Sequence, residues 1–76
     1  MNIPKLYQDA KQGNADAQYN LGLCLKKGDG VEKNLVEAVK WFRKAAVQGH
    51  AQGQLNLGVC LKKGDGVEKN LVEAVK

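Results

Sequence analysis

Residues 21–40 read LGLCLKKGDGVEKNLVEAVK, and residues 57–76 repeat this stretch with a single change, Leu23 to Val59. The two copies start 36 residues apart. A fixed period of about 20–50 residues is typical of repeat proteins, in which each unit packs on the one before it. We therefore divide the chain into a partial preceding helix at residues 1–14, a complete repeat at residues 15–50 and a truncated second repeat at residues 51–76.

The first half of the complete repeat predicts a helix over residues 15–27, which we call helix A. Its equivalent in the second repeat is also called helix A. Gly28 stands where a left-handed C-terminal cap is expected, and Asp29-Gly30 continues the turn. At about 100° per residue, one side of helix A gathers the residues expected in the core, which are Ala17, Gln18, Leu21, Cys24, Leu25 and Gly28.

The second half of the repeat predicts helix B, which begins after Asn34. The Asn34 side chain is expected to cap this helix, with Glu37 returning a bond to the Asn34 backbone. Spacing of i, i+3, i+4 and i+7 marks its core-facing stripe, which comprises Leu35, Ala38, Val39, Phe42, Ala45 and Ala46. Residues 3–12 occupy the register of a preceding helix B, with Leu6 and Ala10 in the places of Phe42 and Ala46.

The repeat, ADAQYNLGLCLKKGDGVEKNLVEAVKWFRKAAVQGH, resembles the Sel-one-like repeat, a relative of the tetratricopeptide repeat (TPR). The matching positions are Ala17-Gln18, Leu21-Gly22, Gly28-x-Gly30-Val31, Ala38-Val39-x-Trp41-Phe42 and Lys44-Ala45-Ala46-x-Gln48-Gly49. Leu25, where the family often has Tyr, and Glu32, where Pro is common, depart from it. The resemblance implies an all-α, right-handed superhelix (solenoid) of antiparallel helix pairs, acting as a protein-protein interaction adaptor or scaffold.

The side of helix A opposite the core is the predicted partner-binding surface, because the corresponding face lines the concave groove of TPR-like stacks. We call it the helix A face. It comprises Tyr19, Asn20, Leu23, Lys26 and Lys27, with Leu55, Asn56, Val59, Lys62 and Lys63 as their equivalents. Exposed apolar side chains, two Asn amides and two Lys pairs suit an acidic peptide or a carboxylate. The alternative is that these are ordinary solvated positions of a repeat.

Composition narrows the class of partner. The net charge is +4, but Glu32, Glu37, Glu68 and Glu73 interleave with the lysines, and no basic cluster with stacking aromatics is present. We expect a protein or peptide partner and no nucleic acid. No apolar run reaches the length of a membrane span, and the opening residues lack the layout of a secretory signal. With cysteines expected to be reduced, a cytoplasmic location is predicted.

Catalysis is not expected, because the chain contains no Ser and no Thr that could act as a nucleophile. Cys24 and Cys60 are equivalent positions on successive repeats, whose helices are expected to lie about 8–10 Å or more apart, which is too far for a disulfide. The single His, His50, occupies the helix-start position of Asn14 and is interpreted as a surface turn residue. No metal or cofactor site is predicted.

Two alternatives remain open. Some cysteine-rich members of the resembled family have been described as penicillin-binding or weakly β-lactamase-like, although no Ser is present here to accept an acyl group. The chain could also be a self-associating repeat fragment that pairs through Leu71, Val72 and Val75 at its C-terminal end. Trp41 is expected to seal the junction between repeats.

Overall fold

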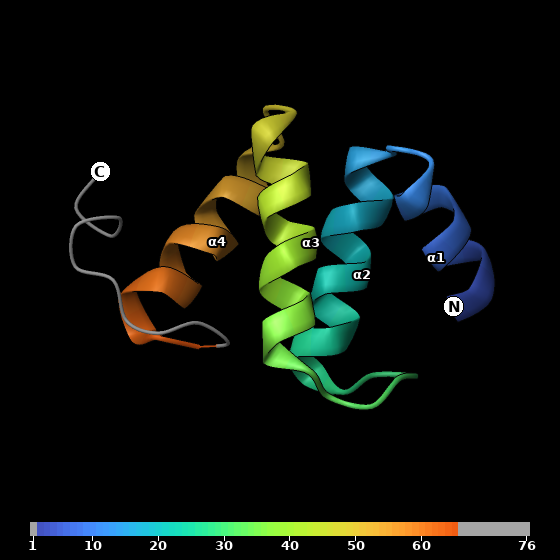
Figure 1. Ribbon diagram of the computed structural model, residues 1–76, viewed down its shortest axis with the longest axis horizontal. Coiled ribbons are helices and arrows are strands. Elements are labelled where there is room, and N and C mark those ends of the chain that lie inside the picture. Colours follow the sequence, from blue (N-terminus) through green and yellow to red (C-terminus); the bar gives the residue numbers. More distant parts are fainter. Residues whose placement is uncertain (1, 66–76) are drawn as a thin grey trace.

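The computed structural model describes residues 2–65, which form helices without strands. The helices are α1 (Ile3–Lys11), α2 (Ala15–Lys27), α3 (Leu35–Val47) and α4 (Ala51–Lys63). They stand in a row in chain order, and each packs mainly against its neighbours in sequence (Figure 1). The all-α prediction is confirmed. None of the helices in residues 2–65 is long and apolar enough to cross a lipid bilayer.

Both ends of α2 follow from its sequence. The Asn14 side chain accepts a hydrogen bond from the Ala17 N–H at 2.9 Å and so caps the start. At the other end Gly28 adopts φ 73°, and its N–H donates to the carbonyl of Cys24. That left-handed conformation favours glycine, so the helix stops at the predicted residue. The side chains predicted to face the core, from Ala17 to Leu25, are buried.

The start of α3 differs from the prediction in one respect. Asn34 caps the helix as expected, with its Oδ1 accepting from the Glu37 N–H at 3.0 Å. The return bond from Glu37 is absent, because the Asn34 N–H already donates to the carbonyl of Leu25 at 2.9 Å. The Glu37 carboxylate instead accepts a hydrogen bond from the hydroxyl of Tyr7 at 3.3 Å, which connects α1 to α3.

The core lies between α2 and α3. Leu21 and Phe42 are fully buried, and Leu25 is only 2% exposed. Phe42 packs over Gly22: a Cβ placed on Gly22 would lie 2.6 Å from Cε1 of the ring. The absence of a side chain at residue 22 therefore allows α2 and α3 to approach closely.

The contacts of the first repeat recur 36 residues later. Gln18 Nε2 donates to the carbonyl of Ala10 at 3.0 Å, and Gln54 Nε2 donates to that of Ala46 at 3.1 Å. Gly64, like Gly28, ends its helix in the left-handed region, at φ 77°. The pair α1–α2 is thus built like the pair α3–α4. Residues 66–76, which include the apolar positions predicted to mediate self-association, lie outside the described residues.

Candidate functional site

The helix A face is divided between α2 and α4, whose residues 19–27 and 55–63 are equivalent. On α2, Lys27 is exposed and the other predicted residues are half-buried. On α4 exposure is greater, and Leu55 is 67% exposed. The half-buried members are Tyr19, Asn20, Leu23, Lys26, Asn56 and Val59, and the exposed members are Lys27, Leu55, Lys62 and Lys63.

Tyr19 and Leu23 are not the exposed apolar contacts that the sequence suggested. Both are half-buried and pack against the core. The ring of Tyr19 lies against Phe42 of α3, with centroids 6.0 Å apart, and stacks on His50 with centroids 4.8 Å apart. Phe42 and His50 therefore cover part of the α2 surface. Only Leu55 is an exposed large apolar residue of the helix A face.

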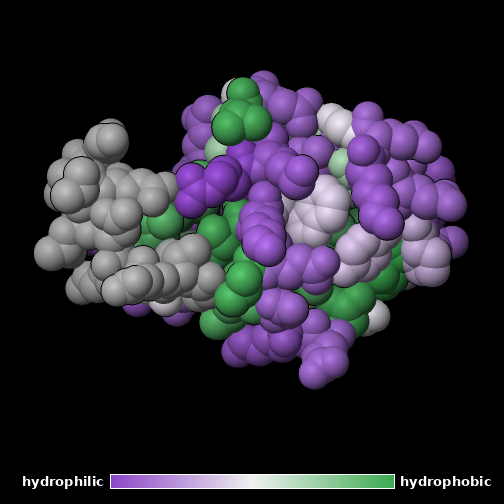
Figure 2. Space-filling view, in the orientation of Figure 1, coloured by the Kyte–Doolittle hydropathy of each residue, from purple (hydrophilic) through white to green (hydrophobic). Residues whose placement is uncertain are grey.

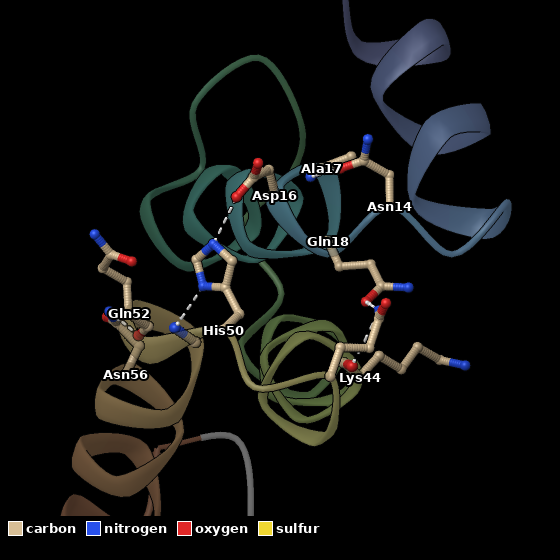
Figure 3. Close-up of polar contacts among 10 residues, drawn as sticks. Asn14, Asp16, Ala17, Gln18, Lys44, His50, Gln52 and Asn56 are labelled. Carbon is tan, nitrogen blue, oxygen red and sulfur yellow. Dashed lines mark hydrogen bonds and ion pairs between the residues drawn. The ribbon is translucent and has the colours of Figure 1, made fainter.

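His50 is the residue whose role the sequence did not reveal. It occupies the predicted helix-start position, where Nδ1 accepts from the Gly53 N–H at 3.0 Å. Its Nε2 lies 2.9 Å from Oδ1 of Asp16 on α2. Because Nδ1 is the acceptor, Nε2 carries the proton and donates to Asp16. Figure 3 shows the imidazole bridging the two helices.

This bridge corrects the interpretation of His50 as a surface turn residue. Its side chain is only 12% exposed, between Asp16 and Tyr19. Alignment with Asn14 indicated the capping role, but nothing in the sequence spacing indicated that a ring at position 50 would reach residues 16 and 19 on α2. Such a ring fixes the start of α4 against the start of α2.

Lysines of both repeats influence the pKa of the buried Cys60 thiol on α4. Burial is the main cause of the raised pKa of the Cys60 thiol. The positive charge of Lys26 lowers this pKa, the carboxylate of Asp65 raises it further, and the charge of Lys63 lowers it. Lys26 belongs to α2 and Lys63 to α4. Lys62 and Lys63 are exposed, as is Lys27.

The two Asn residues of the helix A face differ in their hydrogen bonds. Asn56 Nδ2 donates to the carbonyl of Gln52, one turn earlier in α4, at 3.0 Å. Its Oδ1 points away from that bond and can accept from a partner. The structure records no side-chain hydrogen bond between Asn20 and any other residue of the described range 2–65. Asn20 therefore has both a donor and an acceptor available.

The cysteines form no disulfide with each other. Both are buried, and burial is also the main cause of the raised pKa of the Cys24 thiol, to which the nearby carboxylate of Asp29 adds. Within residues 2–65, no three His, Cys, Asp or Glu side chains gather closely enough to hold a metal ion. Trp41 lies half-buried where α1 meets α3, edge-on to Tyr7 with ring centroids 6.3 Å apart.

Comparisons with known proteins identify the repeat. A family model for the Sel1 repeat matches residues 15–50 and 51–76. The crystal structure of a Sel1 repeat protein from Oxalobacter formigenes is similar with a TM-score of 0.87 and 50% identity, over 92% of this chain and 29% of that chain.

Two curated proteins are also similar over part of the chain. DAP3-binding cell death enhancer 1 of Rattus norvegicus is 46% identical over 37 residues, which is 49% of this chain and 7% of that protein. Secretory immunoglobulin A-binding protein EsiB of Escherichia coli O6:H1 (strain CFT073) is 45% identical over 45 residues, which is 59% of this chain and 9% of that protein. The chain thus spans less than a tenth of the length of either relative.

The resemblance to the Sel-one-like repeat is confirmed by these matches, and with it the TPR-like tandem-repeat solenoid. Because the family model covers both repeats and a solved member shares the arrangement of the helices, the chain belongs to the Sel1 repeat family.

Proposed function

We propose that this chain is a non-enzymatic protein-interaction module that binds an acidic peptide or protein segment along the helix A face. Membership in the Sel1 repeat family supports the general part of the proposal, an interaction repeat. Two similar proteins are named for a protein that they bind, DAP3 in one case and secretory immunoglobulin A in the other.

One observation supports the specific part: lysines stand at equivalent positions of α2 and α4, as Lys26-Lys27 and Lys62-Lys63. Lys26 and Lys63 both act on the Cys60 thiol, although they lie on successive repeats. Lys27 and Lys62 are exposed. A chain of carboxylates lying across both helices would meet cations from both, and charge-assisted hydrogen bonds of this kind are stronger than neutral ones.

The neighbouring side chains suit the same ligand. Asn20 offers an amide with no hydrogen bond to another described residue, and Asn56 offers an amide oxygen. These groups can pair with the backbone of an extended segment. Leu55, at 67% exposed, supplies an apolar contact beside them. Affinity would then come from charge and from hydrogen bonds to the main chain, with little apolar burial.

Fluorescence anisotropy with a labelled, glutamate-rich peptide tests this proposal. The variant combines Asn20→Ala, Asn56→Ala, Lys27→Glu and Lys63→Glu. We expect the dissociation constant to rise at least about tenfold, because the variant removes two amides and reverses two charges. The matched control is Lys11→Glu with Lys33→Glu, which changes the net charge of the chain by the same amount but at exposed positions outside the helix A face. Equal weakening by both variants would mean non-specific charge attraction and would remove the site.

Self-association and a cytoplasmic location stay predictions. Sedimentation at several protein concentrations checks the first, and a single monomeric species throughout would dismiss it. The enzymatic alternative is checked by incubating the purified chain with a chromogenic β-lactam. We expect no hydrolysis above the rate in buffer, and measurable turnover would revive that alternative.

A further inference from the structure

A cavity of about 300 Å³ lies where α1, the end of α2 and the start of α3 meet. We call it the α1–α3 cavity, and its lining comprises Tyr7, Leu25, Val31, Glu32, Lys33, Asn34 and Glu37. Figure 2 shows the α1 side of the molecule as mostly hydrophilic, with hydrophobic atoms in its lower part. The cavity likewise combines apolar walls, from Leu25 and Val31, with polar groups. Its size and mixed lining are those of a small ligand pocket.

One carboxylate of the lining lacks a cationic partner. Glu37 is half-buried in the first turn of α3. Its Oε2 accepts a hydrogen bond from the Tyr7 hydroxyl at 3.3 Å, which is longer than the usual O–H···O distance of about 2.5–3.0 Å. The structure records no ion pair between Glu37 and a basic residue of the range 2–65. This carboxylate therefore has acceptor capacity left for a cationic donor.

The charges around Glu37 favour a cation. The lining contains two carboxylates, Glu32 and Glu37, and one ammonium group, that of Lys33. Burial is the main cause of the raised pKa of Tyr7, and the charge of Glu37 and the hydrogen bond to it raise this pKa further. Tyr7 therefore stays protonated at neutral pH and brings no charge of its own. A cation in the cavity would meet more negative than positive charge.

The repeated sequence indicates which cation fits. Residues 25–37, which supply most of the lining, recur without change as residues 61–73, whereas Tyr7 corresponds to Arg43. One copy of the lining sequence is thus accompanied by an arginine and the other by a tyrosine. A guanidinium offers a planar fork of N–H donors that matches a carboxylate, whereas a phenol offers a single O–H. The copy with Tyr7 therefore lacks the guanidinium that accompanies the other copy.

We propose that the α1–α3 cavity binds an arginine side chain of a partner protein. The guanidinium meets the Glu37 carboxylate, and the aliphatic stem lies against Leu25 and Val31. Glu32, which is exposed, adds a second carboxylate at the rim. This ligand is basic, whereas the ligand proposed for the helix A face is acidic and contacts α2 and α4. The site therefore stands independently of the function proposed above.

Titration of the ¹⁵N-labelled chain with a blocked peptide, Ala-Gly-Arg-Gly-Ala, tests the proposal. We expect the amides of residues 31–37 to shift, with a dissociation constant of about 0.1–1 mM, because one side chain makes most of the contacts. Control peptides with lysine or citrulline in place of arginine should bind at least about threefold and tenfold more weakly. Equal binding of the arginine and citrulline peptides would overturn the proposal. Non-specific attraction cannot mimic the expected result, because the chain itself carries a net charge of +4.

Two variants locate the binding at the carboxylate. Glu37→Gln keeps the size of the side chain and an oxygen for the Tyr7 hydroxyl but removes the charge, so it should weaken the arginine peptide at least about tenfold. Its matched control, Asp29→Asn, removes an exposed carboxylate outside the lining and should change the affinity less than about twofold. Lys33→Gln removes the ammonium of the lining and should tighten binding about two- to fivefold. An unchanged affinity for Glu37→Gln would refute the site.

The variant Tyr7→Arg supplies the guanidinium from within the chain. We expect it to abolish binding of the arginine peptide, because its own side chain then occupies the cavity and pairs with Glu37. The matched control, Gln8→Arg, adds the same charge at an exposed position of α1 and should change the affinity less than about threefold. Circular dichroism verifies that both variants stay folded. Full binding by folded Tyr7→Arg would contradict the assignment.

Ethylguanidinium separates a protein ligand from a small molecule, because it carries the same cationic group without a peptide. We expect it to shift the same amides but to bind at least about threefold more weakly than the arginine peptide, whose flanking residues also contact the exposed Glu32 and Asn34. Tighter binding of ethylguanidinium would overturn the choice of a protein ligand. Shifts confined to α2 and α4 with either probe would contradict the α1–α3 cavity as the site.

Discussion

Replacing Gly22 with alanine tests the packing of the two helices that form the core. A Cβ at residue 22 would lie 2.6 Å from Cε1 and 2.7 Å from Cδ1 of Phe42. Carbon atoms in contact normally stand about 3.5–4.0 Å apart, so the overlap is about 1 Å. The ring is fully buried and cannot swing into solvent. Either α2 must move away from α3 or Phe42 must leave its place.

The magnitude follows from two opposing effects. Alanine in place of glycine favours the helix by about 1 kcal/mol. Overpacking of a core costs about 1–3 kcal/mol, and the buried ring places this site at the upper end. We therefore expect Gly22→Ala to lower the free energy of unfolding by about 1–2 kcal/mol. For a chain of this size that corresponds to a fall in Tm of roughly 5–15 °C.

The second repeat supplies a matched control. Gly58 is the equivalent of Gly22, but it is exposed, and apart from its chain neighbours and the nearby backbone of its own helix no atom of the described residues lies within 4 Å of a Cβ placed on it. Here the helix preference acts alone, so Gly58→Ala should stabilise the chain by about 0.5–1 kcal/mol. The same substitution at equivalent positions thus has opposite signs.

Thermal and urea unfolding followed by circular dichroism at about 222 nm measures both variants. A third variant, Phe42→Leu, shrinks the ring that overlaps the new Cβ. In the double-mutant cycle Gly22→Ala and Phe42→Leu should show a favourable coupling of about 1 kcal/mol, because the smaller side chain relieves the clash. The reasoning is refuted if Gly22→Ala raises the Tm, or if the two changes are additive.

Three other changes extend the test. His50→Asn keeps a capping side chain but loses the bridge to α2, so it should lower the free energy of unfolding in urea by about 1 kcal/mol. His50→Ala also loses the cap and should lower it by about 1 kcal/mol more. Equal losses for the two variants would contradict the capping hydrogen bond. Burial raises the pKa of Cys24 and Cys60 above the ordinary 9.0. The stability that they contribute is therefore complete below about pH 9 and is lost as the pH rises through their pKa in the folded chain. The parent should lose more stability than a Cys24→Ala, Cys60→Ala variant between about pH 8 and pH 10, and parallel curves would contradict this. Gln18→Met removes two hydrogen bonds of a side chain that is 5% exposed and should cost about 1–2 kcal/mol, whereas Gln54→Met at an exposed site should cost less than about 0.5 kcal/mol. Similar losses of stability at the two positions would contradict the reasoning that burial makes the hydrogen bonds of Gln18 more important than that of Gln54.

Much of the fold could be predicted from the sequence, because helix ends depend on local chemistry. Asn14 and Gly28 bound α2 at the predicted residues, since capping needs only side chains and backbone within one turn. The core stripe of α3 also follows from periodicity, because Ala38, Val39 and Phe42 point to one side of any helix in that register.

Contacts between helices were predicted less well, because periodicity gives the direction of a residue on its own helix but not the residue of another helix that it contacts. Tyr19 stands opposite the core of α2, yet His50, the N-cap of α4, covers it. Glu37 stands where its side chain was predicted to bond to the backbone of Asn34, yet its carboxylate accepts a hydrogen bond from the hydroxyl of Tyr7 on α1. The helix A face is correspondingly less exposed on α2 than on α4. Whether it binds a partner stays a prediction.

The stacking of the second repeat on the first is measured most directly by nuclear Overhauser effects between the rings of Tyr19 and His50. Their centroids are 4.8 Å apart in this structure, and His50 caps α4, the first helix of the second repeat. We predict strong cross-peaks between the ring protons of Tyr19 and His50, beside those between Tyr7 and Trp41. A folded, helical chain with resolved signals for both rings and no cross-peak between Tyr19 and His50 would contradict the account.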